Sequence, residues 1–90
     1  MVNSQGPWIV IVTSNAEREL KRLAPEVRDR VLKGIDRLHS GSTRDIKKLK
    51  NYPDTWRLRI GDWRIFFTVT FRERAIYILS VRHRREAYRN

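Results

Sequence analysis

The sequence predicts an α+β fold in which one domain spans residues 1–90. Three observations carry this prediction. A β-branched run lies near the N-terminus, two stretches follow with apolar residues at helical spacing, and two alternating runs are joined by Gly-Asp. We therefore expect an N-terminal strand, a helical hairpin and a three-stranded antiparallel meander that completes a roughly four-stranded sheet. A chain of 90 residues with 40% hydrophobic side chains has room for one modest core.

The first strand is expected over Trp8–Thr13, after a short loose leader at residues 1–7. Its almost unbroken run of apolar residues is typical of a strand that is covered on both faces. A helix should then begin at Ser14, because Ser14 and Glu17 have the spacing of a capping box.

A second helix should begin at Pro25, which cannot continue the first helix but suits the first turn of the next. Gly41 is a natural residue to end it. The core-facing residues recur at helical spacing, and they are Ala16, Leu20, Leu23, Val27, Val31, Ile35 and Leu38.

Residues 42–55 form a polar connection, in which Ile46 and Leu49 are expected to pin a single helical turn. The meander follows. Its first two strands are joined by Gly61-Asp62, and two residues with glycine first are typical of a tight β-hairpin. The three strands are expected at Trp56–Ile60, Trp63–Thr70 and Ala75–Val81.

The charge is large and unevenly distributed. Twenty Lys and Arg against ten Asp and Glu give a net charge of +10, of which +8 lies in residues 44–90. Such an excess indicates a polyanionic partner, either nucleic acid or an acidic protein, although solubility alone is the simpler alternative. The chain has no cysteine and only two histidines, so neither a metal nor another cofactor is expected. No signal peptide or membrane-spanning segment is recognisable, which indicates a cytoplasmic protein without a membrane partner.

The hairpin register sorts its side chains onto two faces. With a two-residue turn, Ile60 lies opposite Trp63 and Arg59 lies opposite Arg64. One face should then be apolar and available to the helices, with Trp56, Leu58, Ile60, Trp63, Ile65, Phe67 and Val69. The other face should carry Arg57, Arg59, Arg64, Phe66 and Thr68.

Three guanidinium groups on one face, with no acid supplied by those strands, form an unfavourable cluster until an anion arrives. Guanidinium groups match phosphate oxygens in pairs, so Arg57, Arg59 and Arg64 are interpreted as a preformed phosphate cradle. Phe66, expected to be exposed beside them, could stack on a nucleobase. The alternative is a solvated outer face with splayed arginines.

The C-terminal segment 82–90 concentrates four arginines with a histidine, a glutamate and a tyrosine. If the last strand ends near Val81, these side chains project from the same rim of the sheet. Histidine is the residue type suited to proton transfer near neutral pH, and we expect the surrounding positive charge to keep His83 neutral and able to accept a proton. The alternative is a basic tail that only grips phosphate or docks on an acidic partner.

The chain resembles the RelE/ParE superfamily of toxins over nearly its whole length. The resemblance is sharpest in Trp56-Arg57-Leu58-Arg59-Ile60-Gly61-Asp62-Trp63-Arg64-Ile65 and in His83-Arg84-Arg85-Glu86-Ala87-Tyr88-Arg89. It implies a RelE-like fold, ribosome-dependent cleavage of messenger RNA, and inhibition by an acidic or partly disordered antitoxin. Carried over by position, it implies roles for Arg57 and Arg59, for Arg64, for one tail arginine (Arg82, Arg84 or Arg85) and for Tyr88.

These residues lead to the hypothesis of a metal-independent endoribonuclease in which the ribose 2′-OH attacks the adjacent phosphate. The expected catalytic residues are Arg57, Arg59, Arg64, His83, Arg84 and Tyr88. The expected substrate-binding residues are Lys47, Lys48, Lys50, Phe66, Arg82 and Arg85. Some RelE toxins have lysines where this chain has arginines on the second strand, which shifts proton transfer towards His83, Tyr88 or Glu86. The alternatives are a ParE-like inhibitor of DNA gyrase and a non-catalytic, basic nucleic-acid-binding module.

Overall fold

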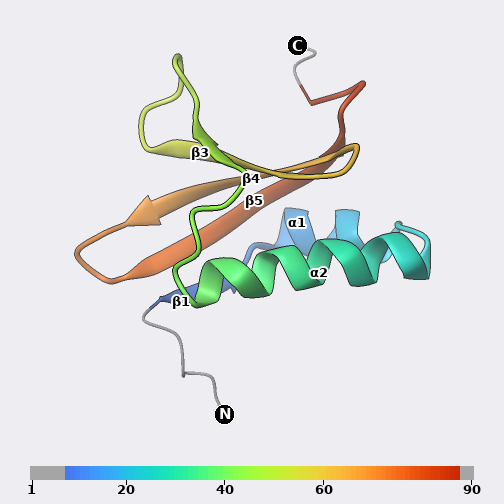
Figure 1. Ribbon diagram of the computed structural model, residues 1–90, viewed down its shortest axis with the longest axis horizontal. Coiled ribbons are helices and arrows are strands. Elements are labelled where there is room, and N and C mark those ends of the chain that lie inside the picture. Colours follow the sequence, from blue (N-terminus) through green and yellow to red (C-terminus); the bar gives the residue numbers. More distant parts are fainter. Residues whose placement is uncertain (1–7, 88–90) are drawn as a thin grey trace.

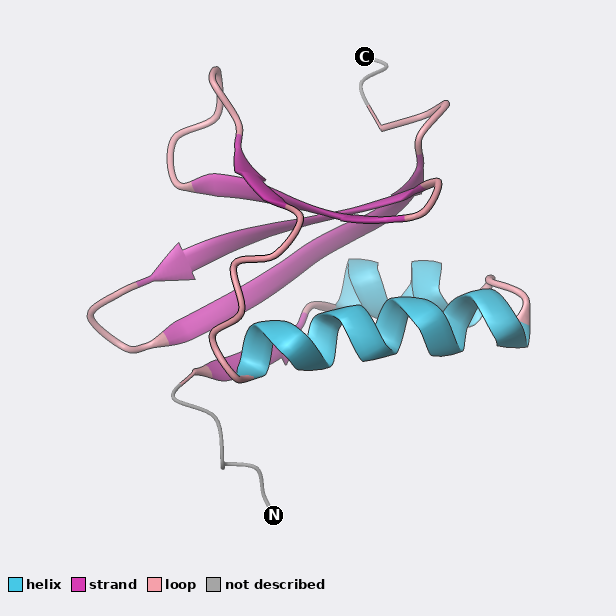
Figure 2. Ribbon diagram, viewed as in Figure 1, coloured by secondary structure: helices cyan, strands magenta, loops and turns pink. Residues whose placement is uncertain are grey.

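The computed structural model describes residues 8–87, which form two helices and one five-stranded mixed sheet (Figures 1 and 2). The sheet order is β1-β5-β4-β3-β2, with β1 parallel to β5 and the other neighbours antiparallel. This confirms the α+β class, with one strand more than expected. The elements in chain order are β1 (Ile9–Val12), α1 (Ser14–Lys21), α2 (Pro25–His39), β2 (Ile46–Lys48), β3 (Thr55–Ile60), β4 (Trp63–Thr70) and β5 (Ala75–His83).

Both helices lie on one face of the sheet, and the other face is turned away from them (Figure 2). The core fills the layer between. Val31, Leu58, Ile65 and Ile78 are its largest fully buried side chains. The expected apolar face of the hairpin is confirmed, because its other members are buried in this cluster or packed against it.

The register predicted for the hairpin is confirmed: Ile60 pairs with Trp63, Arg59 with Arg64 and Arg57 with Phe66. Of the two turn residues only Gly61 has a positive φ, at 56°. That pattern is typical of a type II′ turn, whose twist matches the flanking strands.

The segment that was expected to form a helical turn is a strand instead. Ile46 pairs with Leu58 and Lys47 with Arg57, so β2 becomes the fifth strand of the sheet. Ile46 packs against the core through this pairing. A three-residue strand has almost no local signal, and the buried edge of β3 decides its conformation.

The first strand is shorter than expected and is not covered on both faces. It is an edge strand of the sheet, and Ile9 is 58% exposed and Ile11 39% exposed. Only Val10 of β1 packs against the core. The apolar run misled the prediction because the helices cover a single face of the sheet.

The first helix is capped one residue earlier than the capping-box spacing suggested. Thr13, not Ser14, is the N-cap, and its Oγ1 accepts a hydrogen bond from the Ala16 N–H at 3.3 Å. The same hydroxyl donates to the Ile78 carbonyl at 2.7 Å. Pairing with β5 therefore holds Thr13 extended, and this fixes where the helix begins.

The second helix has the predicted ends. Pro25 occupies the first turn, and Gly41 follows the C-cap residue Ser40 with φ 86°. A left-handed residue at that place ends a helix without the steric cost that a side chain would carry.

Gly34 lets α2 approach β3 closely, because a Cβ at this position would overlap Cδ1 of Ile60. We expect Gly34→Ala to destabilise the protein by about 1 kcal/mol, since overpacking costs about 1–3 kcal/mol and alanine regains about 1 kcal/mol of helix propensity. Urea unfolding measures this. In an Ile60→Val background, which lacks the clashing Cδ1 methyl group and leaves only the 3.0 Å approach to Cγ1, the same change should cost less stability. Equal destabilisation in both backgrounds would contradict the close approach.

Candidate functional site

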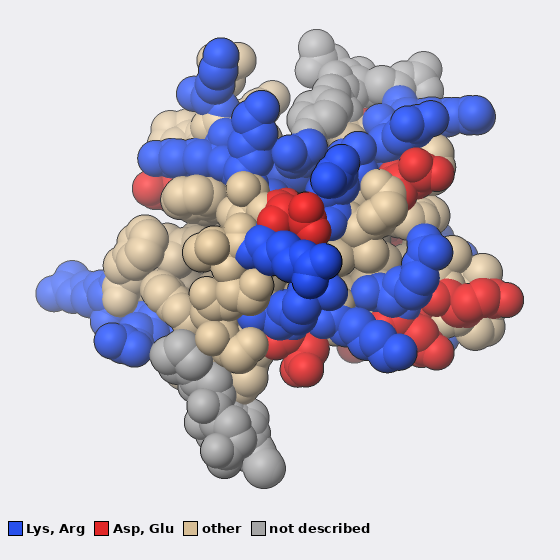
Figure 3. All heavy atoms as spheres, in the orientation of Figure 1, with Lys and Arg blue, Asp and Glu red and all other residues tan. Residues whose placement is uncertain are grey.

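The face of the sheet that is turned away from the helices carries a cationic cluster. Strand alternation puts Arg57, Arg59 and Arg64 on this face, and we call these three residues the arginine cradle. The register also places Lys47 beside Arg57 and Arg82 beside Arg64. In Figure 3, Lys and Arg atoms gather along this upper side, whereas basic and acidic atoms alternate over the helices.

A carboxylate forms an ion pair with an arginine of the cradle. Asp45, in the turn before β2, has its Oδ1 3.5 Å from Nη2 of Arg59, with side-chain exposures of 33% and 57%. The β-strands themselves supply no acid, as expected, but the prediction overlooked this turn. An ion pair of that length and exposure contributes about 0–1 kcal/mol, so it offsets only part of the repulsion within the cradle.

Arg64 is held by backbone carbonyls. Its Nη1 donates to the carbonyls of Gly61 at 2.9 Å and Trp63 at 3.0 Å. Within residues 8–87, its Nε is buried and has no hydrogen-bond partner. The guanidinium is therefore fixed over the hairpin turn without being neutralised by a carboxylate of that part of the chain.

Phe66 is half-buried rather than fully exposed. It lies on the cradle face between its partners Arg57 on β3 and Ser80 on β5. The ring is therefore less accessible than the sequence alone suggested.

The three lysines expected to bind substrate are not on one surface. Lys47 lies on the cradle face, opposite Arg57. Lys48 is the next residue on β2 and points to the other face, where its Nζ lies 5.8 Å from the centre of the Trp56 ring. Lys50 is exposed in the loop beyond β2. Only Lys47 of the three therefore extends the cradle.

Two of the C-terminal arginines, Arg82 and Arg84, are anchored to the rest of the fold. The last strand runs on to His83, so Arg82 belongs to β5 rather than to a tail. The Arg84 N–H donates to the Asp62 carbonyl at 2.7 Å, and its Nε lies 3.7 Å from Asp62 Oδ1. This holds Arg84 at the β3–β4 turn, beside the cradle. Arg85 is exposed, and Tyr88 lies outside the described residues.

His83 is not placed as the proton acceptor that the sequence suggested. Its Nδ1 accepts a hydrogen bond from the Arg85 N–H at 3.2 Å, and its ring meets Trp63 edge-on with centroids 5.3 Å apart. Trp63 belongs to the apolar face, so the imidazole lies away from the cradle. A neutral ring whose Nδ1 accepts must carry its proton on Nε2, which leaves that nitrogen a donor.

Tyr77 lies on the cradle side of β5, opposite Thr68. Its hydroxyl donates to Oε1 of Glu73 at 3.2 Å. The negative charge of Glu73 and this hydrogen bond raise the pKa of Tyr77 above its ordinary value. A phenol that holds its proton more tightly is a poor base at neutral pH.

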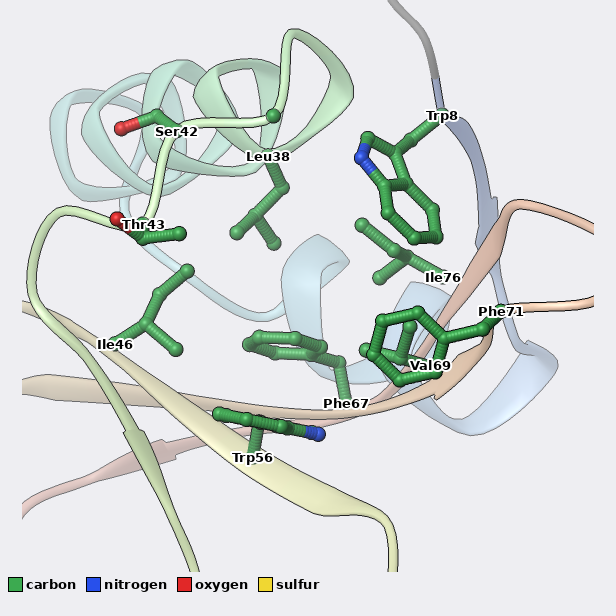
Figure 4. A pocket seen from close by; sticks show the side chains of 11 residues that line it. Trp8, Leu38, Ser42, Thr43, Ile46, Trp56, Phe67, Val69, Phe71 and Ile76 are labelled. Carbon is green, nitrogen blue, oxygen red and sulfur yellow. The ribbon is translucent and has the colours of Figure 1, made fainter.

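An apolar pocket of about 170 Å³ opens in the layer between the helices and the sheet (Figure 4). Trp56 and Phe67 line one side, and Trp8 and Phe71 meet edge-on at the other, with centroids 5.7 Å apart. None of its lining residues is charged, so it is separate from the cationic cluster. Among the described residues, no group of three or more His, Asp or Glu could hold a metal ion, and no helix is long and apolar enough to cross a membrane.

Sequence reasoning missed the carboxylates that hold these arginines. Asp45, Asp62 and Glu19 pair with Arg59, Arg84 and Arg82 respectively. Glu19 and Arg82 are 63 positions apart, and no local pattern in a single sequence joins them. Only the pair of Asp62 with Arg84 could have been anticipated. The β3–β4 turn, which contains Asp62, lies at the same end of the sheet as the residues that follow β5, and Arg84 is the first of these.

Comparison with known proteins gives consistent results. Residues 10–88 match the family model of the ParE toxin of type II toxin–antitoxin systems. The RelE1 protein of Methanocaldococcus jannaschii, which is named as a toxin, is 39% identical over 46 residues, covering 51% of each chain. The alignment thus spans about half the length of that curated relative.

Solved structures resemble the whole fold. A chain of the RelBE2 toxin–antitoxin complex of Mycobacterium tuberculosis superposes with TM-score 0.78 and 26% identity, covering 86% of this chain and 98% of that one. A chain of the RelE–RelB complex of Pyrococcus horikoshii gives TM-score 0.76 and 25% identity, covering 90% and 99%.

Removing the carboxylate beside the cradle should strengthen anion binding. We expect Asp45→Asn to bind a single-stranded 2′-deoxyoligonucleotide up to about fivefold more tightly, corresponding to the 0.2–1 kcal/mol scale of an exposed ion pair. Asparagine tolerates the positive φ of 61° at this position, so the backbone is preserved. Fluorescence anisotropy measures the affinity.

Asp54→Asn is the matched control, because Asp54 also has a positive φ, of 57°, and lies at the far end of β3. Equal tightening by both variants would indicate an effect of net charge alone and would contradict a local role for Asp45.

Proposed function

The chain belongs to the ParE toxin family of type II toxin–antitoxin systems, within the RelE/ParE superfamily, and on that premise we propose that it cleaves messenger RNA on the ribosome without a metal ion. The observation that carries the proposal is the in-register pairing of Arg59 with Arg64, with Arg57 on the same face. Like charges placed directly opposite one another destabilise a sheet, and a bound phosphate would turn that repulsion into attraction.

The chemistry proposed is an internal transfer at phosphorus. The ribose 2′-oxygen attacks the adjacent phosphorus, the bond to the 5′-oxygen of the next nucleotide breaks, and the products are a 2′,3′-cyclic phosphate and a free 5′-hydroxyl. One proton leaves the 2′-hydroxyl and one is added to the departing 5′-oxygen. Arg57, Arg59 and Arg64 stabilise the negative charge that grows on the phosphate oxygens, and Arg84 supports them from the hairpin turn.

The cradle itself has no suitable base, because a guanidinium stays protonated. With Nδ1 of His83 already accepting from Arg85, the proton transfers fall to Glu86 or Tyr88. In this proposal Lys47 extends the cationic track along the RNA backbone, and the open part of Phe66 stacks on a base.

The positive charge of the chain also indicates an acidic protein partner. Several of the matched solved structures are complexes named for a RelE toxin and a RelB antitoxin, and we propose that an acidic antitoxin covers this chain in the same manner. The excess of ten positive charges suits such a partner as well as it suits RNA. The ribosome would supply the RNA in an extended form that the cradle can reach.

The family model is described as ParE, and this favours inhibition of DNA gyrase as a second candidate function. A supercoiling assay with purified gyrase and a reconstituted translation assay separate the two. The nuclease predicts cut messages and unaffected gyrase. A non-catalytic nucleic-acid-binding module predicts salt-dependent binding without cut ends.

The cradle is tested by removing one guanidinium at a time. We expect Arg59→Ala and Arg64→Ala each to reduce the rate of message cleavage by about 10²–10³-fold, the range found for groups that stabilise developing charge. Primer extension in a reconstituted translation system, with analysis of the RNA ends, measures the rate. Arg72→Ala is the control, because Arg72 is exposed in the turn after β4. Wild-type rates in both cradle variants would exclude the mechanism.

The role of His83 is tested with two amides. We expect His83→Asn to cleave within about tenfold of wild type, because its Oδ1 can replace Nδ1 as the acceptor for Arg85; loss of a proton-transfer group costs about 10²–10⁴-fold. In His83→Gln the side-chain oxygen lies one carbon further from the backbone, too far to replace Nδ1 as the acceptor for Arg85, so this variant should lose more of its cleavage rate. A loss above a hundredfold in both variants would instead indicate that His83 transfers the proton, and Tyr88→Phe gives the comparison for the tyrosine.

A further inference from the structure

The free edge of β5 is covered by side chains of α1. The parallel strand β1 reaches only as far as Ile78, its last partner being Val12. Beyond that point Asn15 Nδ2 donates to the Leu79 carbonyl at 2.9 Å, and Glu19 Oε1 accepts from the Val81 N–H at 2.8 Å. Two residues one helical turn apart therefore take the place of the next strand.

Asn15 Nδ2 also lies 3.4 Å from Glu19 Oε1, and Glu19 in turn reaches Arg82, which Asn15 does not. The other Glu19 oxygen, Oε2, lies 3.0 Å from Nε of Arg82, and the Glu19 side chain is only 17% exposed while that of Arg82 is 46% exposed. Both oxygens of the carboxylate are thus engaged, one by the strand and one by the guanidinium. A half-shielded pair of this length is screened less by solvent than the other ion pairs of the described residues, whose distances are 3.5–3.8 Å.

The contact determines where the charge of Arg82 lies. The register puts Arg82 opposite Arg64, at the end of the row that begins with Arg59. Glu19 draws its side chain to the edge of the sheet, beside a groove of about 640 Å³ that is also lined by Arg22, Trp63 and Glu86. Within residues 8–87 this pair uses the Nε–H, one of five N–H donors on the guanidinium, and leaves the donors on its terminal nitrogens available to an anion.

We propose that Glu19 is a positioning residue, which fixes Arg82 at the rim of the cradle so that it meets the RNA phosphate next to the one held by Arg59 and Arg64. This rests on the proposed nuclease function and adds to it a residue of α1 that never touches RNA. Without Glu19, Arg82 would be repelled by Arg64 and would swing freely at the end of β5.

The test is a double-mutant cycle on cleavage by the full-length toxin. We expect Glu19→Ala and Arg82→Ala to lower kcat by a similar factor, about tenfold or more, because misplacing a binding group costs as much as removing it. The double variant should lose little beyond either single change. Glu19→Gln, which keeps an oxygen for the Val81 N–H but loses the charge, should fall between wild type and Glu19→Ala.

Two controls separate positioning from general loosening. Asn15→Ala removes the neighbouring edge hydrogen bond from β5 and a longer one, of 3.4 Å, to Glu19 Oε1, but leaves the pair between Glu19 Oε2 and Arg82 in place. Glu17→Ala removes a negative charge from the same helix. Both should keep the wild-type kcat. A wild-type rate in Glu19→Ala or in Arg82→Ala, losses that multiply in the double variant, or an equal loss in Asn15→Ala would each overturn the proposal.

A physical readout keeps this test distinct from that of the proposed function. The ¹⁵N NMR resonance of Arg82 Nε–H should shift in Glu19→Ala and stay in place in Asn15→Ala. If the wild-type toxin cuts no RNA, the nuclease proposal fails, and the same cycle is then measured on binding of a 2′-deoxyoligonucleotide. Equal and non-additive weakening would still support positioning by Glu19, and additive weakening would reject it.

Discussion

The in-register pairing of β3 with β4 is the constraint on which the rest of the molecule depends. It places Leu58 beside Ile65 on the buried face and Arg59 beside Arg64 on the opposite face. Full burial of one such aliphatic side chain stabilises a fold by about 1.5–3 kcal/mol. A like-charged cross-strand pair costs up to about 1 kcal/mol. Burial of the apolar face therefore decides the register. It holds Arg59 opposite Arg64 although the interaction between these two arginines is itself repulsive.

The same hierarchy explains how the rest of the cationic cluster is organised. Elements next to the hairpin bring single carboxylates to the borders of the cluster: Asp45 lies in the turn before β2, Glu19 on α1, and Asp62 in the hairpin turn itself. Each touches one arginine from the edge of the cluster, and none inserts between Arg59 and Arg64. The carboxylates hold individual guanidinium groups in place while the centre of the cluster keeps its excess positive charge.

The parts of the fold that could be predicted are those whose cause is local in sequence. A two-residue turn fixes a hairpin register, and proline and glycine mark the ends of α2, so these features follow from a few adjacent residues. The N-cap moved from Ser14 to Thr13 because β5, more than sixty residues away, holds Thr13 extended. Strand β2 forms because β3 offers it an edge to pair with. Ile9 and Ile11 of β1 are exposed because both helices lie on the opposite face of the sheet.

The candidate site divides along the same line. Arg57, Arg59 and Arg64 were found from alternation alone, since a strand determines which side chains share a face. The orientation of His83 could not be found in this way, because it depends on the Arg85 amide and the Trp63 ring meeting the imidazole after the chain has folded. Residue type indicates which side chains are capable of the chemistry, but only the hydrogen-bond partners decide which nitrogen is available. A histidine among arginines is therefore weak grounds for a general base. Arginines paired across a ladder are stronger grounds for an anion site, because the register fixes which positions face one another but does not require arginine at both of them.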